Sequence, residues 1–129
     1  MLQTNDDLEA SLTRLERPFE RLEDGTYIVK MGADRPLVAV RLAPPVLVMR
    51  VAIGYAPAEA TPLFRPLLEL NATALLHAAY GLEGDRIVLS AALPLESVDL
   101  NEMEAVLADI DLALAEHVPS LHELVKSRA

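Results

Sequence analysis

Apolar side chains recur at spacings of three and four residues in the first part of the chain. They are Leu8, Leu12, Leu15 and Phe19. This spacing is typical of one face of an α-helix, which we expect over residues 5–17. Thr4 or Asn5 can cap the first turn of this helix with a side-chain oxygen. Pro18 ends it, because a proline disfavours helical geometry in the residue before it.

Three runs in the next part of the chain have the character of β-strands. Residues 26–31 place Tyr27, Val29 and Met31 on one side, residues 36–42 are rich in β-branched residues, and residues 46–53 follow the prolines as a third run. In the last of them, Leu47, Met49 and Val51 share one face. Arg50 lies on the opposite face. Because short turns join the three runs, we expect an antiparallel meander of three strands.

The middle of the chain permits two interpretations. A helix begins at Thr61-Pro62, because threonine is a favoured N-cap and proline fits the first helical position. Pro66 fits poorly beyond the first turn, so this helix is either short or distorted. On apolar spacing alone it could continue to Tyr80. The turn at residues 83–85 lies between two alternating runs, however, and this favours a helix that ends near Asn71, followed by a β-hairpin.

The last part of the chain has the pattern of an amphipathic helix. Asp99 can cap it, and apolar residues recur at spacings of three and four up to Val118. Pro119 breaks this helix, and Ser120 can cap a short terminal one. We therefore expect an α+β fold in a single domain over residues 1–129. Its elements follow the order α-β-β-β-α-β-β-α, with helices packed on an antiparallel sheet.

The charge of the chain narrows the range of partners. Its formal net charge is −9, from 20 acidic and 11 basic residues. An acidic surface disfavours the phosphate backbone of nucleic acids and anionic membranes, because like charges repel. The longest apolar run, residues 42–49, is too short to cross a bilayer. With no cysteine and no signal-peptide pattern, we expect a soluble, cytoplasmic protein that binds neither nucleic acid nor membrane.

Groups that carry chemistry are sparse. The histidines lack the spacing of a metal site, and they are His77, His117 and His122. The hairpin places His77 on a strand. The acidic pair Asp6-Asp7 fits a helix start, and Asp109 with Asp111 fits a solvated helix face, rather than acid–base catalysis. No serine-nucleophile or phosphate-binding motif occurs. We therefore expect no enzyme, no cofactor and no metal.

Three segments resemble those of a known fold. They read LLELN at residues 67–71, GLEGDRIVLSAALPLE at residues 81–96 and DLNEMEAVLADI at residues 99–110. With the order of elements, they resemble class I type III secretion chaperones. They also resemble the related YbjN-like family, often labelled bacterial sensory transduction regulators, to which we assign the chain. The resemblance implies a type III secretion chaperone-like fold and a chaperone-like or regulatory role.

The middle helix is apolar on more than one side. Its large apolar residues are Leu63, Phe64, Leu67, Leu68 and Leu70. All five cannot face one sheet unless Pro66 bends the segment, so the alternative is an interface for a second copy or a partner. Our leading hypothesis is a non-enzymatic homodimer that holds a partner polypeptide through apolar surface. The competing hypothesis is a small-molecule-binding or catalytic domain with a pocket between sheet and helices.

Overall fold

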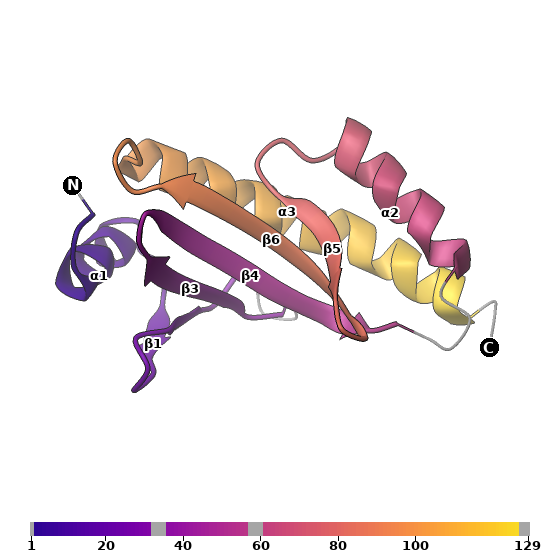
Figure 1. Cartoon of the computed structure of the whole chain (residues 1–129), viewed down its shortest axis with the longest axis horizontal. Helices are drawn as coiled ribbons and strands as arrows, with labels where there is room; N and C mark the ends of the chain where they lie inside the picture. The colour runs from indigo at the N-terminus through magenta and orange to yellow at the C-terminus, as the bar shows by residue number, and fades with distance from the viewer. Residues whose placement is uncertain (1, 32–35, 57–60, 127–129) are drawn as a thin grey trace.

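The computed structural model describes residues 2–31, 36–56 and 61–126. The elements, in chain order, are α1 (Asn5–Arg14), β1 (Phe19–Arg21), β2 (Tyr27–Val29), β3 (Val38–Ala43), β4 (Val46–Tyr55), α2 (Thr61–Thr73), β5 (Ala79–Glu83), β6 (Arg86–Pro94) and α3 (Leu100–Lys126). The strands form one six-stranded sheet in the order β1-β2-β3-β4-β6-β5 (Figure 1). Every neighbouring pair is antiparallel. The expected α+β fold is confirmed, with one strand more than the pattern predicts.

One face of the sheet is buried and the other is open. In β4, Leu47, Met49 and Val51 are fully buried, whereas Arg50 on the opposite face is exposed. The same core contains Leu8 and Leu12 of α1, together with apolar residues of α2 and α3. The helices therefore pack on a single face, and α3 runs along the sheet with α2 beside it (Figure 1).

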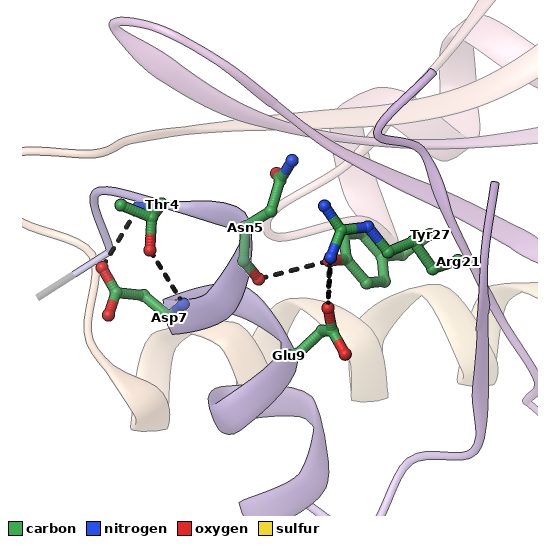
Figure 2. A network of polar contacts seen from close by, with 6 residues as sticks. All are labelled: Thr4, Asn5, Asp7, Glu9, Arg21 and Tyr27. Carbon is green, nitrogen blue, oxygen red and sulfur yellow. Dashed lines mark hydrogen bonds and ion pairs between the residues drawn. The ribbon is translucent and has the colours of Figure 1, made fainter. Parts of the chain in front are cut away.

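The first turns of α1 and α3 are capped as the sequence predicts. Thr4 Oγ1 accepts a hydrogen bond from the Asp7 N–H at 3.1 Å, and the Asp7 carboxylate accepts one from the Thr4 N–H at 3.0 Å (Figure 2). In α3, the Asp99 carboxylate accepts from the Glu102 N–H at 2.7 Å. These bonds satisfy amide groups that a helix leaves without internal partners.

The end of α1 differs from the expectation. The Glu16 N–H donates to the Thr13 carbonyl and the Arg17 N–H to the Leu12 carbonyl, both at 3.0 Å. This pattern is a Schellman motif, with Glu16 in the left-handed region at a φ of 57°. The expectation that Phe19 lies on the face of this helix is wrong. The chain turns at Glu16 before it reaches Pro18, and Phe19 begins β1, a strand that the pattern does not predict.

A polar cluster joins α1 to the sheet. The Tyr27 hydroxyl donates to the Glu9 carboxylate at 2.7 Å and lies 3.3 Å from the Asn5 carbonyl oxygen (Figure 2). Arg21 of β1 donates to the same carboxylate at 2.8 Å. Burial of the Tyr27 hydroxyl, helped by its bond to Glu9, raises the pKa of Tyr27 to about 12. The cluster ties α1 to β1 and β2.

The predicted hairpin is confirmed. β5 and β6 pair from Glu83 with Arg86 onwards, and Gly84 in the turn has a φ of 60°. β5 begins only at Ala79, so residues 74–78 form a loop and the expectation that His77 lies on a strand is wrong. The physical reason is Asp109 of α3, which binds backbone N–H groups of this loop.

Two prolines lie inside helices. α2 continues through Pro66, and α3 continues through Pro119 to Lys126, so the expected break at Pro119 is wrong. A proline removes one helical hydrogen bond and crowds the preceding turn. Leu114 and Leu121, on either side of Pro119, are both buried in the core, and this packing offsets the cost. None of the helices in the described residues is long and apolar enough to cross a bilayer.

Candidate functional site

An apolar groove lies between α2 and the edge strand β5. It has a volume of about 290 Å³. The residues that line it are Phe64, Leu67, Leu68, Asn71, Tyr80, Gly81 and Leu82. We call this hollow the α2–β5 groove. None of its lining residues is charged, although the chain as a whole is strongly acidic.

The five apolar residues predicted on the middle helix differ in burial. Leu63 and Leu67 are buried in the core, and Leu70 is half-buried against it. Phe64 is half-buried in the groove, and Leu68 is 66% exposed. The helical period explains this division, because Leu63 and Leu67 form one row at a spacing of four and Phe64 and Leu68 form the next. The core therefore takes up only part of this set, and an interface at Phe64 and Leu68 stays a prediction.

Leu82 on β5 forms the opposite wall of the groove, and sequence reasoning missed it as an interface residue. Its side chain is 52% exposed. The alternation of the hairpin places Leu82 on the same face as Tyr80, which is buried. That alternation was the signal available, but it predicts a buried residue. Leu82 is exposed because β5 is the edge of the sheet and α2 covers only part of it.

Asn71 closes part of the β5 edge. The Tyr80 N–H donates to Asn71 Oδ1 at 2.7 Å, and Asn71 Nδ2 donates to the Tyr80 carbonyl at 3.1 Å. The side-chain amide thus pairs with Tyr80 as the backbone of a neighbouring strand would, and it blunts an edge that could otherwise recruit another strand. Asn71 lies near the end of α2, as predicted, and its side chain bonds a strand.

Tyr80 also connects β5 to α3. Its hydroxyl lies 3.0 Å from His117 Nδ1, and the two rings are 6.0 Å apart between centroids. Burial raises the pKa of Tyr80 to about 12. His117 is half-buried.

Asp109 is a structural residue rather than part of a solvated face, so that expectation is wrong. Its side chain is only 10% exposed. One carboxylate oxygen accepts from the His77 N–H at 2.9 Å and from the Leu76 N–H at 3.3 Å. The bonds hold the loop between α2 and β5 against α3. Among the described residues, no three His, Cys, Asp or Glu side chains lie close enough to hold a metal ion.

The open face of the sheet has a shallow hollow of about 580 Å³ over β3 and β4. Its floor includes Ala39 and Val48, and Arg41 and Arg50 border it. Arg50 forms an ion pair with Glu83 of β5. The hollow is therefore of mixed character, with apolar side chains beside two arginines.

The chain matches a family model over nearly all of its length. The CesT_Tir_1 model covers residues 1–127. Comparison with curated protein sequences finds no match.

Solved structures share the fold at low sequence identity. YbjN of E. coli, described as a putative transcription regulator, is 16% identical with a TM-score of 0.71, over 90% of this chain and 92% of that one. A chain of the ExoU–SpcU complex from the type III secretion system of Pseudomonas aeruginosa is 16% identical with a TM-score of 0.70. The match covers 87% of this chain and 95% of that one. The Yersinia pestis type III secretion chaperone SycH, solved with a fragment of YscM2, is 21% identical with a TM-score of 0.59. The match covers 86% of this chain and 99% of that one.

These comparisons agree with the topology and confirm the resemblance seen in the sequence. The open antiparallel sheet with three helices in this chain matches the fold of type III secretion chaperones. The structural likeness alone shows only the fold, and the family model adds the relationship in sequence. This protein therefore belongs to the CesT_Tir_1 family, the family of type III secretion chaperones.

Proposed function

We propose that this protein is a non-enzymatic, chaperone-like binding protein of the cytoplasm, which forms a homodimer through the α2–β5 groove and holds a partner polypeptide. The observation that carries the dimer is the pair of exposed leucines on the walls of the groove, Leu68 at 66% and Leu82 at 52%. Complete burial of a leucine side chain contributes about 1.5–3 kcal/mol. While the Leu68 and Leu82 side chains stay in water, the protein does not gain this free energy.

The absence of charge in the groove supports contact between two copies. A two-fold interface places the same surface of both protomers in contact, so every charge in it meets its own copy. Because the groove is lined by uncharged residues, two copies meet there without burying an ion. The acidic remainder of the surface then stays in solvent.

Asn71 determines what kind of contact the groove makes. Its amide occupies the N–H and carbonyl of Tyr80, so a second copy cannot extend the sheet at that residue. Contact therefore occurs through side chains, with Leu68 of one protomer packing into the groove of its partner.

Sedimentation equilibrium at about tens of micromolar, where weak dimers populate, tests the dimer. We expect the natural chain to sediment as a dimer and Leu68→Glu to sediment as a monomer, because the substitution would bury two facing carboxylates. Leu37→Glu is the matched control, since Leu37 is also exposed but lies outside the groove. A monomeric natural chain, or a Leu68→Glu variant that remains dimeric, would contradict the proposal.

The partner-binding part of the proposal draws support from the similar structures. SycH was solved with a fragment of YscM2, and the ExoU–SpcU structure is a heterodimeric complex. Two open surfaces of this chain, the apolar α2–β5 groove and the mixed hollow over β3 and β4, are available to a polypeptide.

The competing hypothesis of a pocket between sheet and helices has less support. Sheet residues that face the helices, such as Tyr27, Leu47 and Leu89, are fully buried. These side chains fill the layer in which a small molecule would have to bind.

A further inference from the structure

The side of α3 that points away from the sheet is partly apolar. Ala105, Ala108 and Leu112 follow one another at spacings of three and four residues, and all three are exposed. Leu112 is 56% exposed. Residues on the opposite side of the helix, such as Leu107 and Ile110, are fully buried. The fold therefore uses the inner side of α3 and leaves Leu112 without a role in the core.

Ala105, Ala108 and Leu112 form an apolar stripe along the outer side of α3. A second exposed leucine lies beside this stripe and comes from a different element. Leu76, in the loop between α2 and β5, is 85% exposed. Its N–H donates to the Asp109 carboxylate at 3.3 Å. Ala105 and Leu112 neighbour Asp109 on the helix surface, one turn before and one turn after it. The bond therefore holds Leu76 next to the stripe. We call Leu76, Ala105, Ala108 and Leu112 the outer α3 surface.

Carboxylates border this surface. Glu102 and Glu116 are exposed along one side of the stripe. They are fourteen residues apart, about 21 Å along the axis, and Asp109 between them is bonded to the loop. Glu104 and Asp111 lie along the other side, seven residues apart. Glu104 forms an ion pair with Arg17. Residues 100–121 contain no lysine or arginine, so α3 itself supplies acidic side chains and no lysine or arginine to the border.

The charge of the border decides which partner fits. A second copy packed on the same surface would place carboxylates opposite carboxylates, which is unfavourable. A helix with an apolar face and cationic edges fits both features. Alanine allows the close approach of a second helix axis, at about 8–10 Å, while Leu76 and Leu112 project toward its side chains.

We propose that the outer α3 surface is a docking site for a cationic amphipathic helix of a partner protein. The proposal rests on the proposed partner-binding function and adds the place and the chemistry of the partner. Lysine or arginine residues fourteen positions apart on that helix would face Glu102 and Glu116. Exposed ion pairs contribute only about 0.2–1 kcal/mol each, so the two leucines supply most of the affinity and the charges supply the selectivity.

A pair of designed peptides tests the proposal. Both are helical, about three heptads long, with the same leucine and alanine face. One carries lysine on both edges and the other carries glutamate. We expect fluorescence anisotropy to show binding of the lysine peptide to the full chain, weakened by salt, and no binding of the glutamate peptide. Equal binding of the two peptides would overturn the proposal.

Variants on the outer α3 surface test its location. We expect Leu76→Gln combined with Leu112→Gln to lower the affinity for the lysine peptide by about tenfold or more, equivalent to about 1.4 kcal/mol. Leu37→Gln, at another exposed leucine, should leave binding unchanged. If the double variant binds as tightly as the natural chain, attraction to the acidic surface alone explains binding and the proposal is wrong.

A second measurement avoids any dependence on the variants. Amide chemical shifts of the natural chain should change on peptide addition at residues 76, 105, 108 and 112. Changes confined to the α2–β5 groove or the open sheet face would overturn the proposal. The Leu68→Glu variant separates this result from the dimer. Binding of the peptide to that variant supports the outer α3 surface even if the proposed dimer fails, and loss of binding there contradicts it.

Discussion

Single side chains in this protein form hydrogen bonds that a neighbouring strand or helix would otherwise provide to the backbone. Asn71 is the clearest example, because its amide makes two hydrogen bonds to Tyr80 at the edge of the sheet. Asp109 acts in a similar way on the loop that carries Leu76. Each residue stabilises a segment whose backbone groups have no other strand or helix to pair with.

Replacing Asn71 should destabilise the protein. Asn71→Ala removes two hydrogen bonds and leaves the Tyr80 N–H and carbonyl without these partners, so we expect a loss of about 1–3 kcal/mol in the free energy of unfolding. Urea unfolding followed by circular dichroism measures it. Asn101→Ala is the control, since Asn101 is exposed on α3 and should cost little. Equal unfolding midpoints for the two variants would show that the edge contact carries no stability.

The two buried tyrosines should make stability depend on alkaline pH. The pKa of both Tyr27 and Tyr80 is raised to about 12 in the folded protein, above the ordinary value near 10. The unfolded chain therefore releases these protons first. Their contribution is fully present below about pH 10 and is lost as the pH rises toward about 12.

Urea midpoints at about pH 8 and pH 11, on either side of the ordinary tyrosine pKa, measure this effect. We expect the midpoint to fall at the higher pH, and to fall less when Tyr27→Phe and Tyr80→Phe are combined. Tyr55→Phe is the control, because Tyr55 is exposed. The same fall in the double variant and the natural chain would rule out the tyrosines as its cause.

At the scale of elements, helix boundaries depend on more than the prolines. α1 ends at a Schellman motif with Glu16 in left-handed geometry, ahead of Pro18. α2 and α3 continue through Pro66 and Pro119. In each case the backbone bonds or packing available locally outweigh the preference of one residue.

Glycine at position 16 should stabilise the C-terminus of α1. A residue with a β-carbon costs about 1–2 kcal/mol in left-handed geometry, whereas glycine adopts it freely. We expect Glu16→Gly to raise the free energy of unfolding by about 0.5–1 kcal/mol, with part of the gain offset by the greater entropy of glycine in the unfolded chain. Glu16→Ala retains the strain and should give no gain. If alanine and glycine stabilise equally, the charge of Glu16 matters and its geometry does not.

At the scale of the whole molecule, charge and apolar surface are separated. The carboxylates of α3 border its outer side, whereas the α2–β5 groove is uncharged and the hollow on the open sheet face is bordered by Arg41 and Arg50. Three surfaces with different chemistry suit an assembly in which a copy of the chain and a partner bind at different places.

The single domain predicted over residues 1–129 should unfold in one step. The core joins residues of all three helices and the sheet, so loss of any layer exposes the others. We expect far-ultraviolet circular dichroism and tyrosine fluorescence to report the same urea midpoint. Two separate transitions would contradict a single domain.

Much of the fold was predictable because it depends on local patterns. The alternation of Leu47, Met49 and Val51 identifies the buried face of β4, and the turn at Gly84 identifies the hairpin. β1 was missed because a strand of three residues has no period to detect. The site was predictable only in part, since spacing identifies Leu68 as apolar and helical but does not say which row of α2 faces the core.

The sequence by itself determined the order of the elements other than β1, the capped starts of α1 and α3, the acidity and the family. These features depend on neighbours along the chain. Only the tertiary structure decided that Asn71 bonds Tyr80, that Asp109 holds the loop beside it, and that Leu68, Leu76, Leu82 and Leu112 remain exposed. Each of these facts depends on which distant segment packs against a residue, and that is a property of the assembled layers.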